Sequence, residues 1–244
     1  HMDCRDIILL AGLRRVGKTS IMKLIIGELI SKGFDKTRIL FVSLDDFLFN
    51  EKSITDIVAE YRLLHKIRME EKIYLFFDEV TYKDKWTQQL KNLYDKENVK
   101  IIARSSSSSV FIDENAYLTG RSRIIEVKPL DFDEWVEFKD IKLKAVDKDL
   151  MVTYFDEYLS EGGMPEFVLT KDRAYLQNLV EQLIYKDIIA RHNIKMKSVI
   201  KDLFLLLMER SGKQLSINNI AKILNITPSN AKRYIEYFEE TFLI

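Results

Sequence analysis

The sequence has little cysteine, proline or glycine, and it carries no excess of charge of either sign. Its single cysteine, Cys4, excludes an intramolecular disulfide and with it the small disulfide-stabilised folds. Three prolines and eight glycines in 244 residues leave no stretch with the composition of a flexible linker. Lys and Arg together number 38, as do Asp and Glu, so net charge gives no general attraction to nucleic acid or an anionic membrane.

Long apolar runs are also missing, because none approaches the roughly 18 residues of a transmembrane helix. Together with the single cysteine, this predicts a globular protein of the reducing cytoplasm that does not enter a membrane.

Short apolar runs alternate with segments of helical spacing in the first half of the chain. Strand candidates cover 7–11, 38–44, 73–77, 99–103 and 124–127, and helical patterns cover 20–32, 55–68, 85–94 and 110–118. This alternation is typical of a parallel sheet with helices on both faces. From about Pro129 the apolar spacing is helical almost throughout. We therefore expect an α/β, doubly wound core over residues 1–128, followed by a helical, lid-like region over 129–198.

The last part of the chain, residues 199–244, has the pattern of three helices joined by short turns. A helix over 199–210 is followed by one that Ser216 caps, and then by one that begins at Thr227 and Pro228. Thr at the N-cap with Pro at the first helical position is a typical helix start. The arrangement resembles a helix-turn-helix or winged-helix domain. The apolar end of the chain, at Ile244, predicts that this domain is truncated.

The would-be recognition helix of this domain, 228–240, gives mixed support for DNA as a partner. Lys232 and Arg233 stand against three glutamates, whereas binding to phosphates needs a basic surplus. Ser229 and Asn230 add polar side chains of the kind that read base edges. DNA contact and a packing or lid role therefore both stay open.

The first of two strong motifs follows the first strand candidate. Residues 12–19 fit G-x-x-x-x-G-K-[ST], the phosphate-binding loop of nucleotide hydrolases. Glycines let backbone N–H groups close around phosphate oxygens, and the N-terminus of the following helix adds partial positive charge. Lys18 would reach the β- and γ-phosphates, and the Thr19 hydroxyl would bind Mg²⁺. The predicted binding residues are Gly12, Leu13, Arg14, Arg15, Val16, Gly17, Lys18, Thr19 and Ser20.

The second motif is an apolar strand candidate that ends in two acids, Asp78 and Glu79. Asp78 would hold Mg²⁺ in concert with Thr19. Glu79 would orient and deprotonate the attacking water. The strand candidate over 38–44 falls between the two motifs in the sequence, which matches the additional-strand class of P-loop ATPases, where a catalytic Glu is expected.

Two further positions are candidates for contacts to the γ-phosphate. In this class a polar side chain at the end of the 99–103 strand senses the phosphate or the water. Ser105 or Ser106 would do so, although a serine-rich surface loop has the same composition. An arginine near the γ-phosphate would stabilise transition-state charge, within one chain or across a subunit boundary. Arg121 is the candidate, with its neighbour Arg123 or a plain surface arginine as the alternatives.

These residues together resemble the AAA_14 group of AAA+-like archaeal and bacterial ATPases, which are often joined to a domain named DUF4143. The matching pieces are 12–19, 76–80, Trp86, the serines after residue 104, 118–121, 129–135, 162–166 and the helix-turn-helix-like end. The family usually has Thr-Gly where this chain has Ala103 and Arg104, and Pro at the position of Leu13. The resemblance implies ATP as the nucleotide and names no pathway.

The expected activity is that of a Mg²⁺-dependent ATPase. Hydrolysis of the γ-phosphate would drive a conformational change in attached domains, with a homo-oligomer or a protein partner left open. One alternative is a slow nucleotide-gated switch that holds DNA or a protein through its C-terminal domain. Another is a DNA-processing module whose chemistry resides in a missing C-terminal domain. The turnover rate in the absence of a partner distinguishes an ATPase from a switch.

Overall fold

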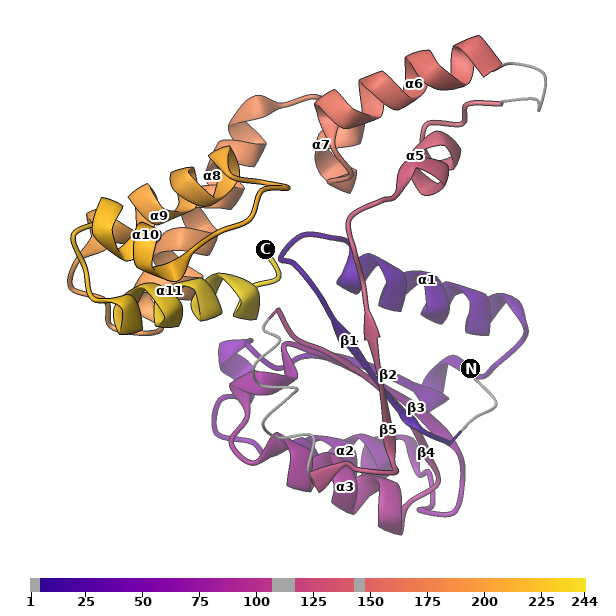
Figure 1. The fold of residues 1–244 in the computed structure, drawn as a ribbon. Coiled ribbons are helices and arrows are strands. Elements are labelled where there is room, and N and C mark those ends of the chain that lie inside the picture. Colours follow the sequence, from indigo (N-terminus) through magenta and orange to yellow (C-terminus); the bar gives the residue numbers. More distant parts are fainter. Residues whose placement is uncertain (1–4, 107–116, 143–147) are drawn as a thin grey trace. The chain divides into compact units, whose positions relative to one another are not determined.

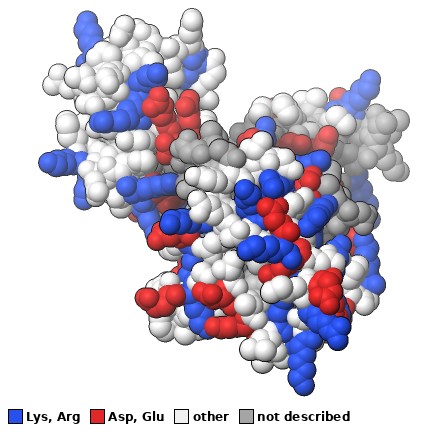
Figure 2. Space-filling model, turned by 90° about the horizontal axis from the view of Figure 1, so that it is seen from below, with Lys and Arg blue, Asp and Glu red and all other residues white. Residues whose placement is uncertain are grey.

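The computed structural model describes residues 5–106, 117–142 and 148–244, and the chain divides into two compact units. The first unit covers residues 1–128 and the second 129–244. Figure 1 shows a sheet with flanking helices in the first unit and helices in the second. On the face drawn in Figure 2, Lys and Arg are interspersed with Asp and Glu, in keeping with the equal numbers of the two kinds. Among the described residues, no helix is long and apolar enough to cross a bilayer.

Five parallel strands form the sheet of the first unit, in the order β2-β3-β4-β1-β5. Their bounds are β1 Ile7–Ala11, β2 Ile39–Ser43, β3 Ile73–Asp78, β4 Val99–Arg104 and β5 Ser122–Glu126. The three central strands are apolar and buried almost throughout, because helices cover both faces of a parallel sheet.

β4 is the strand that separates β1 from β3 in space (Figure 1). β2, which lies between the two motifs in the sequence, forms the edge of the sheet beside β3. The strand inserted between the two motif-bearing strands is therefore β4, and not the 38–44 segment that suggested the additional-strand class.

Helices lie on both faces of the sheet, so the first unit has the doubly wound α/β fold expected of a P-loop ATPase. α1 (Lys18–Ser31) covers one face, and α2 (Ile54–His65) and α3 (Trp86–Lys96) cover the other (Figure 1). Met22 and Leu29 of α1 pack with alternate residues of the central strands, such as Leu10. Short 3₁₀ turns η1, η2 and η3 span Lys36–Arg38, Phe47–Phe49 and Val80–Tyr82. The helix predicted over 110–118 falls almost wholly outside the described residues.

The first helices of the second unit are α5 (Phe132–Phe138), α6 (Lys148–Glu161), α7 (Pro165–Thr170) and α8 (Arg173–Gln182), which the π-helical segment η5 (Leu183–Ala190) continues. Among them, α6 and α7 are joined by a turn that contains Gly162 and Gly163. Gly162 has a φ of 73°, a backbone conformation that residues other than glycine rarely adopt. A Cβ on Gly163 would collide with the backbone of Leu130, whose N–H donates to the Gly163 carbonyl over 2.8 Å. The turn therefore needs one glycine for its backbone conformation and the other for space.

Three helices end the chain, α9 (Lys197–Glu209), α10 (Ile217–Ile223) and α11 (Pro228–Glu240). Thr227 caps α11 as its sequence predicts, because its hydroxyl accepts from the backbone N–H of Asn230 over 3.2 Å. Ser216 takes the N-cap position of α10, but its side chain makes no capping hydrogen bond. No strand occurs in residues 199–244, all of which the structure describes, so the wing of a winged helix is not confirmed.

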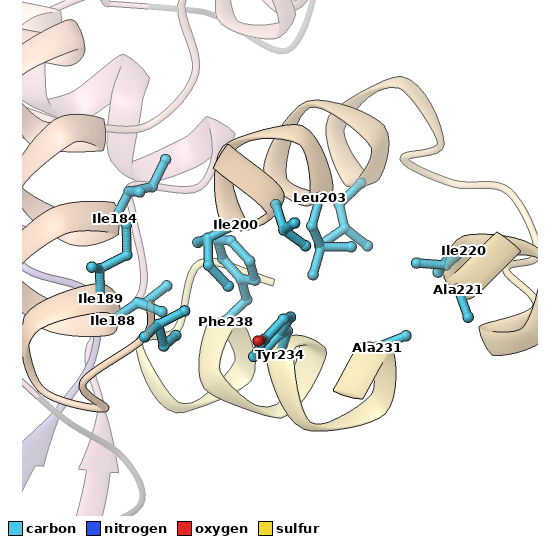
Figure 3. Packing of buried hydrophobic residues seen from close by; sticks show 13 residues of the cluster. Ile184, Ile188, Ile189, Ile200, Leu203, Ile220, Ala221, Ala231, Tyr234 and Phe238 are labelled. Atoms are coloured by element: carbon cyan, nitrogen blue, oxygen red, sulfur yellow. The ribbon is translucent and has the colours of Figure 1, made fainter. Parts of the chain in front are cut away.

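One hydrophobic cluster holds these three helices together (Figure 3). Ile200 and Leu203 of α9 lie toward Phe238 of α11 in its centre. Ile184 and Ile188 of η5 belong to the same cluster. The expected boundary between residues 198 and 199 therefore runs through the middle of one packed core.

Candidate active site

The loop over residues 12–19 leaves β1 at its carboxyl end and leads directly into α1. Gly12 and Gly17 have φ values of 146° and 102°, which only glycine adopts without strain. A Cβ on Gly12 would collide with the carbonyl oxygen of Val127. The buried ammonium group of Lys18 donates to the carbonyl oxygens of Gly12 and Leu13, each over 2.8 Å. The loop therefore holds its lysine inside the curve of its own backbone.

A cavity of about 220 Å³ opens beside this loop. It is lined by Arg14, Arg15, Gly17, Lys18, Thr19, Ser20, Glu79 and Arg104. Three of these lining residues, Arg14, Arg15 and Lys18, are basic residues of the loop. They lie at the N-terminus of α1, where the helix dipole adds positive charge. The cavity is therefore suited to a polyanion such as a nucleoside triphosphate.

The acids predicted to bind metal and activate water lie, like the loop, at the carboxyl ends of the parallel strands. Asp78 ends β3, and its Oδ2 accepts a hydrogen bond from the Thr19 hydroxyl over 3.0 Å. A carboxylate and a hydroxyl in contact are oxygen ligands of the kind that Mg²⁺ takes in nucleotide sites, so these two residues fit the metal. Among the described residues, no cluster of three or more His, Cys, Asp or Glu side chains offers a metal site built from protein alone.

Glu79 follows Asp78 in a left-handed backbone conformation, with a φ of 50°. Burial raises the pKa of its carboxyl group, while the nearby cations Arg14 and Lys18 act in the opposite direction. The backbone N–H of Ser106 also hydrogen-bonds this carboxylate and favours its charged form. Glu79 is thus held at the cavity wall by its surroundings, where a base for water would be needed.

Arg104 is a site residue that the sequence analysis did not single out. It ends β4, next to Leu10 of β1 in the parallel register. Its guanidinium contacts Asp78 and forms an ion pair with Glu79 over 2.7 Å. Burial lowers the pKa of Arg104 to about 10, so the group stays charged at neutral pH. The sequence does carry a signal for Arg104, because it is a charged residue at the end of a buried strand, where a polar sensor is expected.

The predicted sensor Ser105 is buried directly beyond this arginine. Its backbone N–H donates to the carbonyl of Leu10 over 3.2 Å, and its hydroxyl lies 3.1 Å from that of Thr81. Ser105 is close to the acids in the chain, but it is not one of the residues that line the cavity. A contact to the γ-phosphate therefore stays a prediction for Ser105.

Arg121 lies at the amino ends of the strands, opposite the end that carries the phosphate loop. It precedes β5, and its carbonyl accepts from the N–H of Ile7 at the start of β1, over 2.7 Å. Its side chain pairs with Asp95 of α3 over 2.8 Å, and Arg123 lies 3.8 Å from Asp6. Because the loop follows the opposite end of β1, the structure does not bring Arg121 to the cavity of its own chain. A role across a subunit boundary stays a prediction.

Comparison with known proteins finds relatives along nearly the whole chain. Two uncharacterized proteins of Methanocaldococcus jannaschii are similar to it. The first is 30% identical over 249 residues, which is 96% of this chain and 54% of the relative. The second is 28% identical over 270 residues, covering 99% and 56%. The chain thus spans about half the length of these curated relatives. Among solved structures, it is similar to the Aeropyrum pernix ORC1 protein in complex with DNA, with 12% identity, a TM-score of 0.43, and 97% of this chain and 78% of that chain covered.

Family matches divide between the two parts of the chain. Residues 152–244 match a domain of unknown function, DUF8612, and an association with DUF4143 stays a prediction. Residues 4–136, which contain the loop, both acids and Arg104, match AAA_14, described as an AAA domain. Since that match covers more than half of the sequence, the chain belongs to the AAA_14 family of AAA domains.

Proposed function

We propose that the chain is an ATPase that binds Mg²⁺ and ATP in the cavity beside residues 12–19 and hydrolyses the γ-phosphate. The observation that carries the proposal is that Lys18, Thr19 and Glu79 line one cavity, with Asp78 hydrogen-bonded to Thr19. These residues come from separate segments of the sequence and supply separate parts of one reaction. ATP as the nucleotide, in preference to GTP, is proposed from the family.

Each residue has a role that its position supports. Lys18 and the backbone N–H groups at the start of α1 would bind the phosphate oxygens. Thr19 and Asp78 would hold Mg²⁺, which when bound neutralises charge that develops on the phosphates. Glu79 would take the proton of the attacking water at its carboxylate. The cycle of binding and hydrolysis would drive a conformational change in the attached domains.

The proposal is tested by calorimetry with a non-hydrolysable ATP analogue and Mg²⁺. Lys18→Ala should abolish binding, because it removes the charge held inside the loop. Lys23→Ala is the matched control, because Lys23 is an exposed lysine on the same helix and should leave binding unchanged. Unchanged affinity in Lys18→Ala would contradict the assignment of the loop.

A slow nucleotide-gated switch is the second candidate, and one observation favours it. The guanidinium of Arg104 contacts both acids that hydrolysis needs, so turnover requires that these contacts change. A single-turnover measurement of phosphate release separates the two candidates, since a switch without its partner would need minutes or longer for each ATP.

A further inference from the structure

Arg104 contacts two carboxylates that are both largely buried. The side chain of Arg104 is 16% exposed, and those of Asp78 and Glu79 are 6% and 11% exposed. Two adjacent carboxylates in such surroundings are costly unless a cation balances them. Arg104 provides that cation, because its Nε contacts Asp78 and its Nη1 lies 2.7 Å from Glu79.

The contacts of Arg104 occupy the carboxylate that the metal needs. Oδ2 of Asp78 accepts from Thr19, and Oδ1 faces the Nε of Arg104. A carboxylate oxygen can accept a second contact, but the buried guanidinium places a positive charge directly against Oδ1, where it repels a divalent cation. A guanidinium and a divalent cation at Asp78 therefore compete, and the exchange of one for the other raises the positive charge beside the acids from +1 to +2.

We propose that Arg104 is an internal competitor of Mg²⁺ that binds Asp78 and Glu79 and must leave Asp78 before the metal can bind. The inference rests on the proposed function and makes Arg104 a positioning residue of that site. Because one guanidinium contacts both acids, the same movement frees Asp78 for the metal and Glu79 for the water. Arg104 thereby sets the Mg²⁺ concentration at which the site becomes competent.

The competition has two consequences of opposite sign. Without Arg104, Mg²⁺ meets no rival at Asp78, so the site should need less of it. Without both Arg104 and Mg²⁺, the cavity wall loses one cation and keeps the Glu79 carboxylate, so metal-free nucleotide should bind more weakly. A residue that only supported the fold would weaken both kinds of binding.

The test titrates a non-hydrolysable ATP analogue by calorimetry, in EDTA and at a series of Mg²⁺ concentrations. In Arg104→Gln, the half-saturating Mg²⁺ concentration should fall by about tenfold or more, by analogy with the scale on which a nearby cation changes the affinity of an Asp for a proton. The affinity for the metal-free analogue should fall by a similar factor. Arg104→Lys keeps the charge and should restore much of the metal-free affinity.

Arg38→Gln is the matched control, because Arg38 forms a 2.5 Å ion pair with Glu71 near the amino end of β2, away from the cavity. It should change neither affinity. An unchanged or raised Mg²⁺ requirement in Arg104→Gln, with weaker nucleotide binding under all conditions, would overturn the proposal and make Arg104 a direct nucleotide ligand.

A second measurement needs no nucleotide and separates this proposal from the proposed function. Mn²⁺ alone, followed by electron paramagnetic resonance, should bind Arg104→Gln more tightly than wild type, and Mg²⁺ alone should raise the melting temperature of the variant more. Equal Mn²⁺ binding by the two proteins, or none by either, overturns the competition. Failure of wild type to bind the ATP analogue at any Mg²⁺ concentration instead overturns the ATPase assignment.

Discussion

Glu79 combines three features at the scale of a single residue: a backbone conformation rare for side chains, a buried carboxylate and several cations nearby. A non-glycine residue at a φ of 50° costs conformational energy that the surrounding structure must offset. The backbone conformation turns the side chain from the end of β3 into the cavity wall. Local strain of this kind is typical of functional positions.

Glu79→Gln should keep the nucleotide bound and slow hydrolysis by about 10²-fold or more, the usual scale for the loss of a general base. The amide is close in shape to the carboxylate but cannot take a proton from water. Phosphate release under single-turnover conditions measures the rate, and calorimetry with the ATP analogue confirms that binding persists. Turnover equal to wild type would exclude Glu79 as the base.

Which of these residues the sequence could predict depends on whether their role follows from position along the chain. Lys18 and Asp78 are identified by motif spacing, because the chemistry fixes what precedes and follows them. Arg104 is not, because a sequence does not show which carboxylates a guanidinium meets. For Arg121 the sequence holds a further signal, because a residue that precedes a parallel strand lies at the amino end of that strand, opposite the phosphate loop.

At the scale of elements, the buried strands are those that the sequence predicts within one or two residues. β1 and β3 are continuous apolar runs because both their faces are covered, and such runs have clear ends. The spatial order of strands is harder, since β4 joins β1 and β3 through contacts distant in sequence. A wing in residues 199–244 is also harder to predict, because the pattern of three helices does not show whether a wing accompanies them.

The turn between α6 and α7 provides a stability test, with a glycine of α1 as the matched control. Gly163→Ala should lower the free energy of unfolding by about 1–3 kcal/mol, because its Cβ would collide with the backbone of Leu130. Gly27→Ala, in open space on α1, should raise it by roughly 0.5–1 kcal/mol, since glycine weakens a helix. Urea denaturation measures both. A neutral Gly163→Ala would contradict the close approach at this turn.

Helix α11 allows a test of DNA as a partner. Lys232 lies 3.8 Å from Glu236, and Arg233 donates to Asn230 over 2.9 Å, so both cations have contacts within their own helix. If the helix binds DNA, these few cations predict weak non-specific affinity with a shallow salt dependence. Reversing both to Glu should then abolish binding to a mixed-sequence duplex, measured by fluorescence anisotropy, and leave DNA-free ATP hydrolysis unchanged. No binding by wild type at about 50 mM salt would assign the helix to packing or protein recognition.

At the scale of the whole molecule, Arg121 makes oligomerisation testable. Its side chain is 34% exposed and ion-paired to Asp95, and so could reach the cavity of a neighbouring subunit only by exchanging that partner. Arg121→Ala should lower turnover more than nucleotide affinity. Mixing it with Lys18→Ala should restore some phosphate release, because mixed interfaces combine an intact loop with an intact arginine. A monomer in light scattering together with no rescue would leave the Arg121–Asp95 pair with a structural role alone.

Two contacts join the end of β1 and the first residue of the phosphate loop to the last residues of the first unit. The N–H of Val127 donates to the carbonyl of Ala11 over 2.7 Å, and Gly12 lies too close to the Val127 carbonyl to tolerate a side chain. The first unit ends one residue later, at Lys128. Gly12 cannot shift toward Val127 without displacing it, so the end of the first unit is tied to the position of the phosphate loop.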